Sequence, residues 1–224
     1  MAYLSMAEHN RLTKTNRPYR LRARAAAMDR TRERITHAAV ELHGTIGPAA
    51  TTMSAVAERA GVTRATLYRH FPNEVALFTA CSTDWFAANP RPDPAGWATI
   101  VDPASRLSAA LDEIYAYYRS TERMRSNLLR DIAMIPERFR PGIVAFPPTT
   151  VQVLEAGWPG LSEEHVRRAV IGHAVGFETW RSLAREGLTD EEAKELMVRF
   201  VTCIGPEEGL SRPQSDGAAH TSTN

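Results

Sequence analysis

Apolar residues recur at helical spacing along most of this chain, and two short helical patterns separated by a tight break at Gly61 stand out among them. The first pattern places Met53 and Val56 on one face, and the second places Leu67 and Phe71 one turn apart. Glycine has no Cβ and accepts the positive φ that is common just past a helix end. The pattern therefore predicts two short helices that cross closely, as in a helix-turn-helix.

Each of these two patterns begins after a threonine that can cap a helix. Thr52 precedes the first pattern and Thr63 precedes the second, and their hydroxyls can accept from the free N–H groups of the first turn. The outer face of the second helix is polar and basic, and it consists of Arg64, Thr66, Tyr68, Arg69 and His70. A short helix with such a face is suited to the major groove of DNA.

The same stretch resembles the DNA-binding region of the tetracycline-repressor (TetR) family of bacterial transcription regulators. The matching residues are Thr51-Thr52, Ala57, Gly61-Val62, Thr63, Thr66-Leu67-Tyr68, His70-Phe71 and Leu77, and residues 30–43 resemble the family's first helix. Two positions depart from the family. Ala55 stands where a carboxylate usually closes a capping box, and Glu74 stands where a lysine commonly binds a DNA phosphate. That lysine contact is not carried over.

Roles on DNA follow from side-chain chemistry together with this resemblance. Arginine is the commonest bidentate reader of guanine, whereas hydroxyl and imidazole groups often contact phosphates. We expect base contacts from Arg64, Thr66 and Arg69, and phosphate contacts from Thr52, Thr63, Tyr68 and His70.

The rest of the chain predicts an all-α fold, in which a three-helix DNA-binding domain joins a larger helical domain for ligand binding and dimerisation. We expect a basic flexible arm at 1–28, the DNA-binding domain with its connecting helix at 29–88, a proline-rich linker, the helical domain at 96–204 and a disordered tail at 205–224. Further helices are expected after Asp102-Pro103, over 121–134, after Pro148, over 162–185, and from the Thr189–Glu192 capping box to Ile204.

Residues 1–35 hold nine Lys and Arg residues against three Asp and Glu residues, although the whole chain has a net charge of only +1. This excess of positive charge favours attraction of the segment to DNA phosphates. Such basic arms can also enter the adjacent minor groove. Two alternatives stay open. The arm is a solvated extension, or its Ala-Arg run lengthens the first helix.

Aromatic residues, methionines and one histidine of the helical domain and connecting helix can form an apolar effector pocket, although each is also an ordinary core residue. The candidates are Phe78, Trp85, Tyr115, Tyr118, Met124, Trp158, His173 and Phe177. The last helices carry apolar residues on more than one side, and the family resemblance implies that they pair in a homodimer. The interface candidates are Val170, Ala174, Trp180, Met197 and Phe200.

The sequence contains no catalytic, cofactor or metal motif, so we expect no enzyme, no cofactor and no metal site. Cys81 and Cys203 have no metal-binding spacing, and no apolar run is long enough for a bilayer, which favours a cytoplasmic protein without a membrane partner. The interpretation is a homodimeric repressor that binds a palindromic double-stranded operator and is released by a small hydrophobic or aromatic effector. An architectural DNA-binding protein, or an enzyme with an incidental helix-turn-helix, is the alternative.

Overall fold

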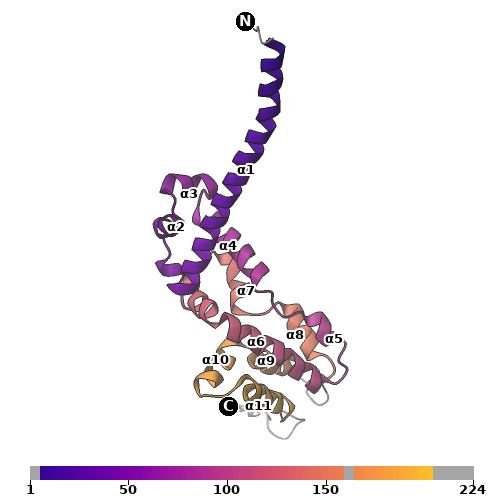
Figure 1. The fold of residues 1–224 in the computed structure, drawn as a ribbon. Helices are drawn as coiled ribbons and strands as arrows, with labels where there is room; N and C mark the ends of the chain where they lie inside the picture. The colour runs from indigo at the N-terminus through magenta and orange to yellow at the C-terminus, as the bar shows by residue number, and fades with distance from the viewer. Residues whose placement is uncertain (1–5, 159–163, 204–224) are drawn as a thin grey trace, which may run out of the picture. The chain divides into compact units, whose positions relative to one another are not determined.

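The structure is a computed structural model that describes residues 6–158 and 164–203, with side chains from residue 19 onward except at 164. It is all-α, and no strand occurs within these ranges (Figure 1). The predicted disordered tail at 205–224 lies outside the described residues. Within the described ranges, no helix combines the length and the apolar character that crossing a bilayer requires.

The chain divides into two compact units that do not follow linear domain boundaries. The first unit contains residues 1–92 and 116–147, and the second contains residues 93–115 and 148–224. The first break, after Pro92, lies within the predicted linker between residues 88 and 96, but residues 116–147 belong to the first unit and not to a continuous helical domain at 96–204. The physical reason is helix α6 (Pro103–Arg130), which starts in the second unit and ends in the first.

The first unit contains the two predicted short helices and their supports. Its helices are α1 (Met6–Thr45), α2 (Met53–Arg59), α3 (Arg64–His70), α4 (Glu74–Ala88), the end of α6 and α7 (Arg140–Val144), with short 3-10 helices at Pro48–Ala50, Ile132–Met134 and Glu137–Phe139. Ile35, Val56, Leu67 and Phe71 are fully buried in one core. Apolar faces of α1, α2, α3 and α4 therefore pack together, as their spacing predicts.

Helix α1 begins at Met6, well before the expected start near Asp29. The arm and the first core helix are thus one continuous helix, which is the alternative that the Ala-Arg run left open. Alanine and arginine are strong helix formers, so nothing at 20–28 interrupts the helix. Arg20, Arg22 and Arg24 are exposed on it. The binding of this arm to DNA stays a prediction.

The second unit packs helices around large aromatic residues. Its helices are α5 (Pro94–Ala98), the start of α6, α8 (Pro148–Glu155), α9 (Glu164–Ala174), α10 (Phe177–Arg185) and α11 (Asp190–Cys203). Trp97 and Trp180 are almost completely buried, and their indole N–H groups donate to the carboxylates of Glu113 and Asp190 at 3.1 and 2.9 Å. These bonds satisfy polar atoms that burial would otherwise leave without a partner.

The starts of α6 and α11 agree with the sequence, whereas two helices expected elsewhere have other bounds. Asp102 caps α6 through Ser105 N, and Thr189 and Glu192 form the predicted capping box of α11. The helix expected over 121–134 is not a separate element, because residues 121–130 continue α6 and Ile132–Met134 form a 3-10 helix. The helix expected over 162–185 is interrupted at Gly176, where a Cβ would lie 3.1 Å from the carbonyl oxygen of His173. This close backbone approach explains why glycine occupies the break.

Candidate nucleic-acid interface and ligand cavity

The helix-turn-helix has the local geometry that its sequence predicts. The Thr52 hydroxyl accepts from Ala55 N at 3.1 Å, and the Thr63 hydroxyl accepts from Thr66 N at 3.2 Å. Gly61 has a φ of 64°. Both N-caps and the glycine break are confirmed, so the start of helix α3 is set by short-range hydrogen bonds.

The inner face of α3 anchors it to the rest of the first unit. Leu67 and Phe71 are fully buried, and the guanidinium of Arg32 on α1 lies 4.2 Å from the centre of the Phe71 ring. Arg32 also donates to the carbonyl oxygen of His70 at 3.0 Å. The same arginine thus contacts the last turn of α3 and the residue after it, which fixes the direction of that helix relative to α1.

The outer face of α3 presents the predicted base-reading residues. Arg64, Tyr68 and Arg69 are exposed, and Arg64 lies 5.9 Å from the Tyr68 ring centre. Thr66 is half-buried and its hydroxyl accepts from the Thr63 hydroxyl at 3.0 Å. The face therefore offers two accessible guanidinium groups, while the two threonines also hold the first turn of the helix.

His70 differs from the other predicted phosphate contacts because its Nε2 atom is buried and has no hydrogen-bond partner. Burial lowers the pKa of this imidazole, and the neighbouring charges of Arg69 and Arg32 lower it further. The ring is therefore neutral at pH 7, and Nε2 does not face solvent. Any phosphate contact by His70 would have to use its other ring nitrogen.

The two positions that depart from the family pattern have local explanations. Ala55 donates its backbone N–H to the Thr52 cap although it lacks the carboxylate of a capping box. Glu74 is the first residue of α4, which Asn73 caps through Ala76 N at 2.8 Å. A carboxylate in a first turn is favourable beside the positive end of the helix dipole. Glu74 thus stabilises a helix start.

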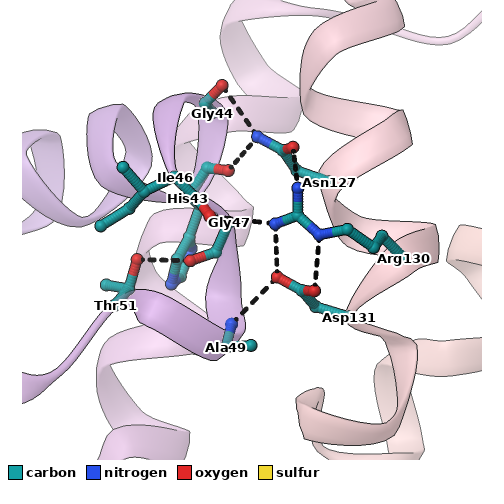
Figure 2. Close-up of polar contacts among 9 residues, drawn as sticks. All are labelled: His43, Gly44, Ile46, Gly47, Ala49, Thr51, Asn127, Arg130 and Asp131. Atoms are coloured by element: carbon teal, nitrogen blue, oxygen red, sulfur yellow. Dashed lines mark hydrogen bonds and ion pairs between the residues drawn. The ribbon is translucent and has the colours of Figure 1, made fainter.

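A polar cluster at the end of α6, formed by Asn127, Arg130 and Asp131, holds the turn that precedes α2 (Figure 2). The last carbonyls of an α-helix have no partner within the helix. Here α6 side chains supply the donors for four consecutive carbonyls, at His43 and Gly44 from Asn127, at Thr45 from Arg123 and at Ile46 from Arg130. We call Asn127, Arg130 and Asp131 the α6 cluster.

Asp131 completes the α6 cluster. Its carboxylate accepts from Ala49 N at 3.1 Å and from two nitrogens of Arg130 at 2.8 Å. The hydrogen bond from Arg130 lowers the pKa of this carboxyl, so it is ionised at pH 7. Gly47 lies against the cluster with a φ of 91°, and a Cβ there would overlap Arg130 and Asp131. Only glycine fits this position, because it tolerates the positive φ and has no Cβ to overlap the cluster.

The first unit also contains an apolar cavity of about 190 Å³. Its lining residues come from α1, α4, α6, α7 and the adjoining loops, and they are Val40, His43, Phe78, Cys81, Ser82, Trp85, Phe86, Arg91, Met124, Leu128, Arg138, Phe139, Gly142 and Ile143. Of the predicted effector residues, the structure brings Phe78, Trp85 and Met124 together here. Such a site, apolar with a few polar groups, is typical of small-molecule pockets.

The other five predicted effector residues do not line this cavity. Tyr118 is buried in the first unit, 6.0 Å from the Phe146 ring centre. The remaining four belong to the second unit. The Tyr115 hydroxyl donates to Ala174 O at 2.8 Å, and Trp158 Nε1 donates to Leu154 O at 2.7 Å. Phe177 stacks against Trp180, and exposed His173 lies beside Phe200; these are packing roles.

Three of the five predicted interface residues are buried inside the second unit itself. Ala174 and Trp180 have no exposed surface, and Met197 is 7% exposed. Val170 is half-buried, whereas Phe200 is 43% exposed. A partner chain can therefore reach Phe200 and part of Val170, while the other three residues stabilise the fold.

Sequence reasoning missed the α6 cluster and the polar residues of the cavity. Asp131 is not among the predicted site residues, although its spacing from Asn127 places both on one face of a helix end. His43, Arg91 and Arg138 lie far apart in the chain, so no local pattern connects them. A polar stripe at the end of an apolar helix is the signal that could have identified the cluster.

Comparisons with known proteins agree with this geometry. The family described as "Bacterial regulatory proteins, tetR family" matches residues 35–81. Among solved structures, the chain is similar to NalD, "the secondary repressor of MexAB-OprM multidrug efflux pump in Pseudomonas aeruginosa", with 19% identity and a TM-score of 0.50 over 77% of this chain and 94% of that one. At this identity the likeness concerns the fold. No curated protein matches the sequence.

Proposed function

The chain belongs to the tetR family of bacterial regulatory proteins, and from this premise we propose that it is a homodimeric repressor that binds a palindromic operator and is released by a small apolar effector. The observation that carries the proposal is the outer face of α3, where Arg64, Tyr68 and Arg69 are exposed on a helix held by its Thr63 cap. Such a regulator would act in the cytoplasm, where its operator lies.

On DNA we assign Arg64, Thr66 and Arg69 to base edges, and Thr52, Thr63 and Tyr68 to phosphates. An arginine that reads a base contributes about 1–3 kcal/mol at one position of each half-site, whereas a phosphate contact strengthens all sequences alike. Arg64→Ala and Arg69→Ala should therefore relax sequence preference. Tyr68→Phe should weaken binding to every sequence by a similar factor.

Operator selection from a random DNA library, followed by fluorescence anisotropy at fixed salt, tests this assignment. Arg123→Ala is the matched control, because Arg123 is also an exposed arginine of the first unit but lies on α6. It should leave affinity and preference unchanged. If Arg64→Ala and Arg69→Ala both behave like this control, α3 is not the reading helix.

A dimer supplies the specificity that one short recognition helix lacks, because two half-sites one helical turn or a multiple apart are read together. Phe200 and Val170 are the accessible members of the proposed interface. Phe200→Asp should place an unpaired charge in it and shift the chain towards monomer in sedimentation velocity experiments. An unchanged sedimentation coefficient would move the interface elsewhere on the second unit.

The cavity offers a route from effector to DNA. Phe78 and Trp85 line it from α4, which follows α3 after three residues, and Met124 lines it from α6. A ligand that displaces α4 also displaces α3, and by linkage the ligand and the operator then weaken each other equally, typically by 1–3 kcal/mol. Operator titrations with and without bound ligand measure this coupling. Zero coupling with the ligand bound would favour an architectural role.

A further inference from the structure

The cavity in the first unit combines an apolar lining with two arginines. Resting on the proposed function, we propose that its effector is an apolar molecule with one carboxylate, whose body fills the cavity and whose charge is bound by Arg91 and Arg138.

The size and lining of the cavity define the apolar body. Phe78, Trp85, Phe86, Phe139 and Ile143 supply aromatic and aliphatic walls around a volume of about 190 Å³. An apolar protein cavity of about 150 Å³ is known to hold benzene. By the same ratio the space here holds roughly eight non-hydrogen atoms, which suits one ring with a short chain.

The two arginines supply positive charge that is not neutralised by any carboxylate among the described residues. Arg91 lies 4.7 Å from the Phe86 ring centre and donates to Gly142 O, whereas Arg138 lies 4.7 Å from the Phe139 ring centre and donates to the Thr79 hydroxyl. Neither forms an ion pair within the described part of the chain. A guanidinium has five N–H donors, so each retains donors for a carboxylate.

The polarity of the remaining lining disfavours a cationic ligand. No Asp or Glu side chain is among the described residues that line the cavity. His43 is only 9% exposed, and its Nδ1 atom lies 3.7 Å from the Cys81 sulfur. Burial lowers the pKa of His43 to about 4, so the ring is neutral at pH 7 and adds hydrogen-bonding capacity without charge. A bound cation would meet two like charges and no counterion.

The test compares three probes of nearly equal shape by isothermal titration calorimetry against the full chain. The probes are 3-phenylpropanoate, 3-phenylpropanamide and 3-phenylpropylammonium. The carboxylate should bind at least about tenfold more tightly than the amide, which is the lower end expected for hydrogen bonds to a charged group because Arg138 is exposed. The ammonium should bind more weakly still.

Variants then assign the charge preference to the two arginines. Arg91→Gln with Arg138→Gln should bind the carboxylate no more tightly than the amide, while the amide affinity stays unchanged. Arg123→Gln, at an arginine outside the cavity lining, is the control and should keep the preference. Since the probe series uses the unaltered protein, the comparison remains informative even if the double variant folds poorly.

The outcomes separate this inference from the proposed function. No binding by any probe, or equal binding of carboxylate and ammonium, overturns the ligand class. Carboxylate binding that depends on the arginines supports it, whether or not operator affinity changes. If the bound carboxylate leaves operator affinity unchanged, the site stands and the effector-released repressor fails.

Discussion

Asn127→Leu removes the polar centre of the α6 cluster while keeping a side chain that branches at Cγ. Asn127 is 8% exposed, and its amide nitrogen donates to His43 O and Gly44 O at 3.0 Å each. Leucine has a similar shape but no donor, so both carbonyls at the end of α1 lose a partner. The variant therefore tests hydrogen bonding rather than the creation of a cavity.

The expected magnitude is worked from those two bonds, because the third bond of this side chain, which Oδ1 accepts from Arg130 at 3.1 Å, involves an exposed guanidinium that water can solvate after its loss. A buried amide–carbonyl hydrogen bond contributes about 0.5–1.5 kcal/mol, so the loss of both lowers the free energy of unfolding by about 1–3 kcal/mol. With a slope of about 2 kcal/mol per molar urea, the unfolding midpoint falls by about 0.5–1.5 M. Hydrogen exchange should also become faster in the turn at 44–50, which the cluster holds.

Arg123→Ala is the matched control, because Arg123 donates to the same turn, at Thr45 O, from an exposed position and at 3.5 Å. Its loss should change the free energy of unfolding by less than about 0.5 kcal/mol. Both proteins are measured at one protein concentration, since association would shift the midpoint. A midpoint for Asn127→Leu no lower than that of the control would refute the role assigned to the α6 cluster.

Three further predictions concern the turn, its carboxylate and the arm. Gly47→Ala and Gly61→Ala both place alanine at a positive φ, which costs about 1–2 kcal/mol, but only Gly47→Ala also displaces Arg130 and Asp131. Thermal unfolding should therefore show a clearly larger loss for Gly47→Ala, and equal losses would contradict the contact with the cluster. Because the folded-state pKa of Asp131 is lowered, its stabilisation is complete above the pKa of an unfolded aspartate, near 3.9, and is lost as the pH falls through the folded value. Urea midpoints of Asp131→Asn and the unaltered protein should differ at pH 7, and the difference should shrink as the pH falls below about 3.9, whereas a constant difference would assign the effect to shape. Deletion of residues 1–28, which removes exposed Arg20, Arg22 and Arg24, should reduce the slope of log operator affinity against log salt by about 0.9 for each phosphate that the arm neutralises. An unchanged slope would make the arm a solvated extension of α1.

The sequence by itself determined the elements whose causes lie within a few residues. The Thr52 and Thr63 caps each bond to the backbone three residues later, and Gly61 adopts its positive φ without help from distant groups. Apolar spacing likewise identified Leu67 and Phe71 as buried residues. These signals are local, so the helix-turn-helix and the exposed polar face of α3 could be predicted before any packing was known.

Tertiary structure decided whatever depends on residues far apart in the chain. The Asp131 carboxylate meets Ala49 N across 82 positions, and the cavity joins His43 to Arg91 and Arg138. The spacing of apolar residues predicts which side of a helix is apolar. It does not predict which distant turn or loop the helix will pack against. The turn before α2 and the charge of the cavity were therefore fixed only when the end of α6 packed in the first unit, because long-range hydrogen bonds and charges have no local sequence signal.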